Sequence, residues 1–140
     1  FYFKMLEEST SLTSAPELKA TTLAGSCYFS MFIGCTSLTS APKLTATELT
    51  YYCYSNMFYN CTKLSTVTML APSDQISKAT SCCDNWLYNA GTDKTVTSRT
   101  LKVMDADAYT ALEGNSVLPA IWKKGTAGTT VKKEDNTEIK

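Results

Sequence analysis

The residues most suited to chemistry in this sequence are its six cysteines, four of which are regularly spaced. Cys27 and Cys35 are eight residues apart, and Cys53 and Cys61 repeat that pair with a shift of 26 positions. Structural zinc usually takes cysteine pairs separated by about two to four residues, often with histidine, and this chain has no histidine. Burial as small apolar side chains explains the spacing best, ahead of a disulfide and, last, a metal site.

The other two cysteines, Cys82 and Cys83, are adjacent. The repeat described below aligns Cys83 with Cys53, so we expect Cys82 to point away from the position that the regular cysteines share. Adjacent cysteines bridge each other only with strain. If any cysteine is reactive or crosslinked, the prediction is Cys82.

Hydroxyl groups are abundant, with 22 threonines and 14 serines, but nothing nearby activates one as a nucleophile. The sequence has no Gly-x-Ser-x-Gly motif and no histidine to accept a proton. Asp105, Asp107 and Glu113 are better explained by helix capping and solvation than by acid–base catalysis, because residues two apart on a helix face different ways. We therefore predict no catalytic residue, no metal site, no cofactor and no enzymatic activity.

The charge balance argues against two classes of partner. Thirteen basic and thirteen acidic residues cancel, so no net field attracts nucleic acid or an anionic membrane. No apolar run approaches the roughly 18 residues that would span a bilayer, so we expect no membrane insertion in this segment.

The strongest pattern is an internal repeat, which must position these groups. Residues 5–30 and 31–56 agree at 14 of 26 positions, and an insertion of four residues restores the frame from Cys83 onward. A repeat of this length predicts a solenoid, because each unit buries its apolar face only against its neighbours. Since Phe1 already lies inside a repeat, we expect the chain to be the later part of a longer array.

Two periods alternate within each repeat. Leu49, Cys53, Met57 and Cys61 follow i, i+4 spacing, as in one stripe of a short helix, and residues 38–44 and 64–69 have extended character. Pro42 has no amide hydrogen and must mark the end of a strand or a bulge. The predicted fold is an α/β repeat solenoid of the leucine-rich-repeat kind, with one parallel strand and one short helix in each repeat of about 26 residues.

The predicted core consists of the apolar and sulfur positions that recur with the repeat. They are Leu12, Leu18, Leu23, Cys27, Met31, Cys35, Leu38, Leu44, Leu49, Cys53, Met57, Cys61, Leu64, Leu70, Cys83 and Leu87.

One phrase of the repeat, Met-Phe-x-x-Cys-Thr-Ser-Leu-Thr-Ser-Ala-Pro-x-Leu at residues 31–44, is accompanied by Cys-Tyr-x-x-Met-Phe at 27–32 and 53–58. It resembles the leucine-rich repeat of BspA-like surface proteins of gut and oral Bacteroidetes. The resemblance covers residues 1–91, about three repeats with the first truncated. It implies a secreted or surface-anchored protein, outside the cell, that recognises a host or microbial surface protein or glycan in adhesion.

The C-terminal part departs from the repeat. We predict a cap over residues 92–122, in which 94–104 adds strands and Asp105 caps a short helix that ends near Gly114. Trp86 and Trp122 are expected to cover the end of the core. Residues 123–140 form either a small hairpin across 134–136 or a flexible tail.

Two groups of residues are candidates for binding. Stacked strands would display a grid of short polar side chains, and tyrosines at non-stripe positions must partly face outward. Alternatively, the hydroxyls only solvate a β-surface and the tyrosines only pack between helices. The candidates are Thr13, Glu17, Thr39, Ser40, Lys43, Ser65, Thr66, Tyr51 and Tyr52. The predicted function is non-enzymatic recognition, and the alternative is a structural spacer that binds nothing itself.

Overall fold

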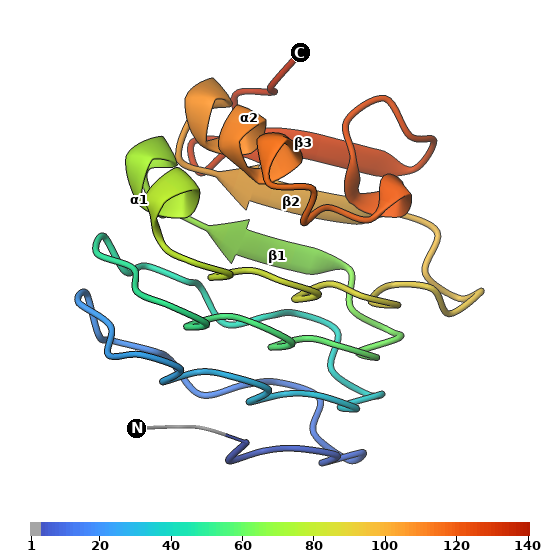
Figure 1. Ribbon diagram of the computed structural model, residues 1–140. Helices are drawn as coiled ribbons and strands as arrows, with labels where there is room; N and C mark the ends of the chain where they lie inside the picture. Colours follow the sequence, from blue (N-terminus) through green and yellow to red (C-terminus); the bar gives the residue numbers. More distant parts are fainter. Residues whose placement is uncertain (1–3) are drawn as a thin grey trace.

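The computed structural model describes residues 4–140, and its regular elements form a small α/β fold with one parallel sheet. The strands are β1 (Thr66–Met69), β2 (Arg99–Val103) and β3 (Thr129–Lys133), in the order β1-β2-β3. The helices are α1 (Ser73–Lys78), α2 (Ala106–Gly114) and the 3₁₀ turn η1 (Ala120–Trp122). Each repeat forms one pass of the chain, and successive passes lie one on another from the N-terminal to the C-terminal side (Figure 1). Among residues 4–140, no helix is long and apolar enough to cross a membrane.

The register of the sheet places apolar side chains on one face. Val67, Leu101 and Val131 are paired across the three strands and are buried, whereas the neighbouring row of Thr66, Thr100 and Thr130 faces the other way. The alternation follows from the two-residue period of a strand.

The earlier passes join this sheet only through isolated bridges. Ser40 pairs with Thr66 and Leu44 pairs with Met69, both in parallel. Between these bridges the earlier pass has one residue more than β1, and Pro42 lies in that interval. Of the two alternatives for Pro42, a strand end or a bulge, the structure has the bulge, which places the missing amide hydrogen where no ladder bond is needed.

The expected helices at residues 23–35 and 49–61 are wrong, because both segments are chains of tight turns. Every fourth residue has a positive φ, as at Ser26, Ser30 and Gly34, and an α-helix excludes that conformation. The amide of Met31 donates to the Tyr28 carbonyl three residues earlier, at 3.2 Å between nitrogen and oxygen. Positive φ at the third residue of such a turn is the type II geometry.

Alternate amides of these turns bond to the next pass instead. The Tyr28 amide donates to the Cys53 carbonyl at 3.1 Å, and the Phe32 amide donates to the Met57 carbonyl at 2.9 Å. Backbone amides therefore bond alternately within a pass and to the next pass, and the two sets together satisfy the donors of these turns. We call residues 23–35, 49–61 and 80–91 the turn face.

The insertion that interrupts the repeat is three residues, not the expected four. Positive φ values recur at Tyr52 and Ser81, and at Asn56 and Asn85, a shift of 29 positions instead of 26. The Phe58 amide accordingly donates to the Trp86 carbonyl at 2.9 Å. Cys82 thus occupies the position of Cys53 and Cys83 that of Tyr54, which corrects the predicted alignment of Cys83 with Cys53.

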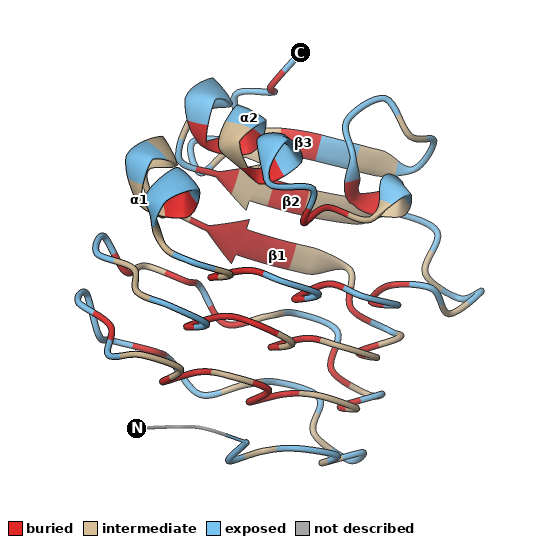
Figure 2. Cartoon of the chain, viewed as in Figure 1, coloured by how far each residue is buried: buried red, intermediate tan, exposed pale blue. Residues whose placement is uncertain are grey.

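Buried residues lie on both the turn face and the sheet (Figure 2), and their side chains form the core. Aromatic side chains stack between passes, with Tyr28 and Tyr54 rings 6.0 Å apart and Phe32 and Phe58 rings 5.6 Å apart, both nearly parallel. Leu12, Leu49 and Leu70 of the predicted core are only half-buried. The other predicted core residues are buried: Leu18, Leu23, Cys27, Met31, Cys35, Leu38, Leu44, Cys53, Met57, Cys61, Leu64, Cys83 and Leu87.

The C-terminal elements lie against the last turns of the stack. As predicted, Asp105 caps α2: its Oδ1 accepts a hydrogen bond from the Ala108 amide at 2.8 Å. Trp86 and Trp122 are fully buried, and their indole nitrogens donate to the Val117 and Ala90 carbonyls, each at 3.0 Å.

Of the two alternatives for residues 123–140, a small hairpin or a flexible tail, the structure has the hairpin. After β3, the Lys133 amide donates to the Thr137 carbonyl at 2.8 Å, and Lys132 pairs antiparallel with Glu138.

Candidate binding surface

All six cysteines are buried free thiols that pack between passes. The Cys35 thiol donates to the Leu6 carbonyl at 3.1 Å, and the Cys61 thiol donates to the Phe32 carbonyl at 3.0 Å, in each case one pass back. Burial raises the pKa of the Cys53 thiol to about 12 and raises that of Cys61 as well. Both thiols are therefore protonated at neutral pH and are poor nucleophiles.

Cys82 does not point away from the repeat position, contrary to the prediction. It is 2% exposed and its thiol donates to the Ile76 carbonyl at 3.6 Å. A hydrogen bond from Cys83 lowers the pKa of Cys82, whereas burial raises the pKa of Cys83. Within residues 4–140, no group of three or more Cys, Asp or Glu side chains is arranged to hold a metal ion.

The predicted hydroxyl grid lies along the parallel passes. The Thr39 amide donates to the Thr13 carbonyl at 3.5 Å, the Ser65 amide donates to the Thr39 carbonyl at 2.8 Å, and Ser40 is bridged to Thr66. The structure thus aligns all five hydroxyl residues of the grid in two neighbouring rows.

The two charged members of the grid are not part of one site with the hydroxyls. Glu17 is exposed, and Lys43 forms an ion pair with Glu134 beyond β3, with 2.8 Å between Nζ and Oε2. Both partners of this pair are largely exposed, so it contributes little to binding or stability.

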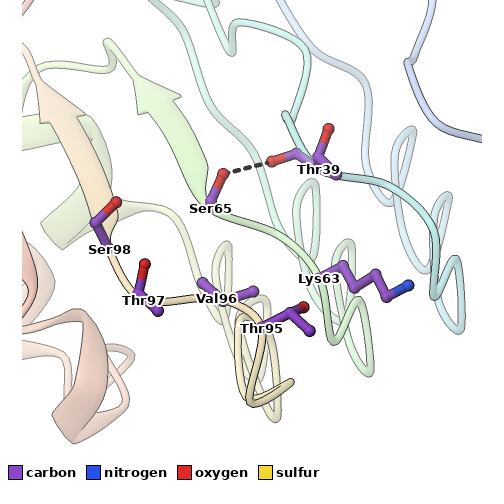
Figure 3. Close-up of a pocket in the computed structure, with 7 residues that line it drawn as sticks. All are labelled: Thr39, Lys63, Ser65, Thr95, Val96, Thr97 and Ser98. Atoms are coloured by element: carbon purple, nitrogen blue, oxygen red, sulfur yellow. Dashed lines mark hydrogen bonds between the residues drawn. The ribbon is translucent and has the colours of Figure 1, made fainter.

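Thr39 and Ser65 line a small hollow of about 270 Å³ together with Lys63 and residues 95–98 (Figure 3). The Ser65 hydroxyl already donates to the Thr39 carbonyl at 3.1 Å, and Thr95 donates to Asp93 Oδ1 at 2.7 Å. The Thr95 hydrogen bonds, from hydroxyl and amide, lower the pKa of Asp93. Lys63 extends away from the hydroxyls of Thr97 and Ser98. Because its polar side chains are already hydrogen-bonded or point away from one another, this hollow is the weaker candidate for a binding site.

The predicted tyrosines lie together and face solvent. Tyr51 is 55% exposed and Tyr52 43% exposed, with ring centroids 6.2 Å apart and planes at 85°. Phe29 of the preceding pass meets Tyr52 edge-on, at 6.5 Å between centroids. A Cβ added at Gly25 would collide with the far end of the Tyr51 ring, so that ring lies directly over the backbone of the preceding pass.

A larger hollow of about 600 Å³ opens beside Tyr51. Gln75 of α1 is held there because its Oε1 accepts a hydrogen bond from the Leu49 amide at 3.0 Å. Across the part of the chain that the structure describes, the Glu48 carboxylate and the Lys78 ammonium have no hydrogen bond or ion pair. The lining residues are Glu48, Leu49, Thr50, Tyr51, Gln75, Lys78, Ala79 and Thr80.

Two departures from the repeat meet at this hollow. The positions equivalent to Tyr51 in the neighbouring passes are Gly25 and Thr80, so a large ring occurs in one pass only. The three-residue insertion falls in the same interval and is occupied by α1, which supplies Gln75 and Lys78. Packing between passes needs neither feature, because the neighbouring pass is built without them.

Sequence reasoning identified Tyr51 and Tyr52 but missed Glu48, Gln75 and Lys78. The available signal was the insertion, which interrupts the repeat within residues 1–91. It also missed Tyr88, an exposed tyrosine of the turn face that stacks on the half-buried Tyr59 with 4.6 Å between ring centroids.

Comparison of the chain with protein families, with curated protein sequences and with solved structures finds no match. A function for the hollow beside Tyr51 has to be argued from its own residues.

Proposed function

We propose that this protein is a non-enzymatic recognition module that binds a protein or glycan surface outside the cell. One observation carries the proposal: the exposed Tyr51 ring and the inserted helix α1, the two departures from the repeat, line the same hollow. Residues needed only for stacking recur in every pass, whereas residues selected for a ligand have no reason to recur.

We further propose that the architecture is a leucine-rich-repeat solenoid of the BspA-like kind. The repeat phrase at residues 31–44 supports the family, and hydrogen bonds between passes at the repeat spacing support the stacking. Location at the cell surface and a role in adhesion rest on the same resemblance. The turns that replace the expected helices are a local variant that keeps the same apolar stripe buried.

Binding is favoured over catalysis by the chemistry of the available groups. The chain has no histidine, and burial keeps thiols such as Cys53 protonated. Tyrosines on a rigid scaffold give contact area at low entropic cost, because each ring has only two rotatable bonds to fix.

Binding of the fluorescently labelled protein to intact epithelial and bacterial cells, measured by flow cytometry, tests this proposal. Tyr51→Ala combined with Tyr52→Ala is expected to abolish most of the signal. Tyr88→Ala, which removes a tyrosine of similar exposure from another part of the turn face, should leave it unchanged. Absence of binding to every cell type tested would instead support the structural spacer.

A further inference from the structure

We infer that the hollow beside Tyr51 binds a neutral oligosaccharide, with one sugar ring stacked on the Tyr51 side chain. This inference rests on the proposed recognition function and names its ligand class. The hollow is about 600 Å³, within the range of small-ligand sites, and opens to solvent next to two exposed rings.

The Tyr51 ring is held as a platform. Gly25 lies beneath it, and Tyr52 meets it edge-on with planes at 85°. With one side covered by the Gly25 backbone and more than half of the side chain exposed, the ring offers its other face. An aromatic face carries partial negative charge, so it attracts the polarised C–H groups on the face of a sugar ring.

Around this platform, two segments of the chain bring both hydrogen-bond donors and acceptors to the hollow. Glu48 offers a carboxylate, Lys78 an ammonium, and Thr50 and Thr80 hydroxyls, each of which both donates and accepts. Gln75 is fixed by the Leu49 amide, and its Nε2, which donates one hydrogen to Asp74 Oδ2 at 3.5 Å, keeps a second hydrogen as a donor. Sugar hydroxyls are also donors and acceptors at once, which suits such a mixed lining.

The charge of the lining selects a neutral ligand. Glu48 and Lys78 are its only formally charged members and cancel each other. A polyanion would meet the Glu48 carboxylate, and a cation would meet the Lys78 ammonium. Neither side chain pairs with another residue in the described chain, so both remain available to hydroxyl groups.

A peptide fits the hollow less well. Apolar anchors of a bound peptide need pockets that remove them from water, and the aliphatic lining consists of Leu49 and Ala79 alone, both already partly buried. Peptide binding is therefore the alternative outcome of the test.

Saturation-transfer NMR with cellotriose, maltotriose and tri-N-acetylchitotriose, each added separately to the complete chain, tests the inference. At least one trisaccharide should bind, with saturation strongest on protons of a single sugar ring. Tyr51→Ala should weaken that binding about tenfold, the value of one aromatic stacking contact.

Gly25→Ala gives a second test that retains every ligand-binding side chain. The added methyl group meets only the far end of the Tyr51 ring, and Gly25 lacks a positive φ, so the fold should tolerate it while the ring is displaced. We expect a loss of affinity similar to that of Tyr51→Ala. Tyr88→Ala is the matched control and should bind like the unmodified chain.

Three results would overturn the inference. Binding to none of the trisaccharides, while cell binding still depends on Tyr51, removes the oligosaccharide and retains recognition. Trisaccharide binding that survives both Tyr51→Ala and Gly25→Ala places the ligand elsewhere. Failure of the unmodified, folded chain to bind either trisaccharides or cells removes the proposed function as well.

Discussion

The periodic region, residues 4–65 and 80–91, and the aperiodic region, residues 66–79 and 92–140, obtain their order in different ways. Every described helix and strand lies between Thr66 and Lys133, although the repeat is clearest before that point. In the periodic region the backbone bonds alternate between a tight turn and the next pass. A repeat can thus specify stacking without specifying helices or strands, provided that each pass satisfies the backbone of its neighbour.

Removal of the Trp122 side chain, which joins the two regions, should have the largest effect on stability. Its side chain is fully buried and its indole nitrogen donates to Ala90 at the end of the last turn segment. We expect Trp122→Ala to lower the free energy of unfolding by about 3–5 kcal/mol, measured by urea denaturation with circular dichroism. Trp122→Phe should cost less, about 1–3 kcal/mol, because it leaves only the Ala90 carbonyl unpaired. A loss below about 1 kcal/mol for the alanine variant would show that the periodic region needs no cover.

Alkaline pH should destabilise the periodic region more than the sheet of the aperiodic region, because that sheet contains no cysteine. The unfolded chain releases thiol protons near pH 9, whereas folded Cys53 keeps its proton up to about 12. The unfolded state therefore binds fewer protons in this window, and stability falls as pH rises. By pH 11, Cys53 alone should cost on the order of 3 kcal/mol.

Hydrogen exchange with mass spectrometry, under reducing conditions, measures this effect. After correction for the intrinsic rate, amides of residues 24–61 should lose protection at lower pH than those of β1, β2 and β3. Cys53→Ala is the control and should reduce the difference. Equal loss in both regions would contradict a separate alkaline sensitivity of the turn face.

Substitution at a left-handed position sharpens the role of the turns. Asn56 has a φ of 55°, a conformation that asparagine and glycine adopt more readily than alanine. Asn56→Ala should cost about 1 kcal/mol in urea denaturation, and Asn56→Gly only a few tenths. If the order of the two variants were reversed, the asparagine side chain and not the backbone would be the important feature.

The smallest effect is expected for the Lys43–Glu134 ion pair, which spans the two regions over the surface. Because both side chains are largely exposed, Lys43→Ala should change the free energy of unfolding by roughly 0.5 kcal/mol or less. The change should disappear at about 1 M salt, where exposed charges are screened. A salt-independent loss would mean that the Lys43 stem, not its charge, stabilises the stack.

The sequence predicted the features that depend on one residue's chemistry. Asp105 was recognisable as a helix cap and Pro42 as a strand end or a bulge, because each imposes a local constraint on the backbone. The helices were wrong because Cys53 and Met57 show the same four-residue spacing in a chain of turns as in a helix. The distinguishing signal was present: an α-helix of about 3.6 residues per turn would rotate the stripe, and Asn56 and Asn60 recur at the left-handed positions.

The register error at Cys83 arose from matching residue types. Cys83 and Leu87 resemble Cys53 and Met57, but the backbone aligns Asn85 with Asn56. The contribution of Gln75 to the hollow could not be predicted either. Its place depends on where a three-residue insertion emerges between passes, which the sequence pattern does not specify.

The amides that leave the turn face toward the next pass have a mechanical consequence. Their hydrogen bonds, such as that from Phe32 to Met57, point along the direction in which the passes are stacked. A force that draws the two ends of the stack apart therefore breaks the hydrogen bonds between one pair of neighbouring passes at a time. Each detached pass would lengthen the tether by about 90 Å, at about 3.4 Å per residue. Such a molecule yields in steps under tension and absorbs work at each one.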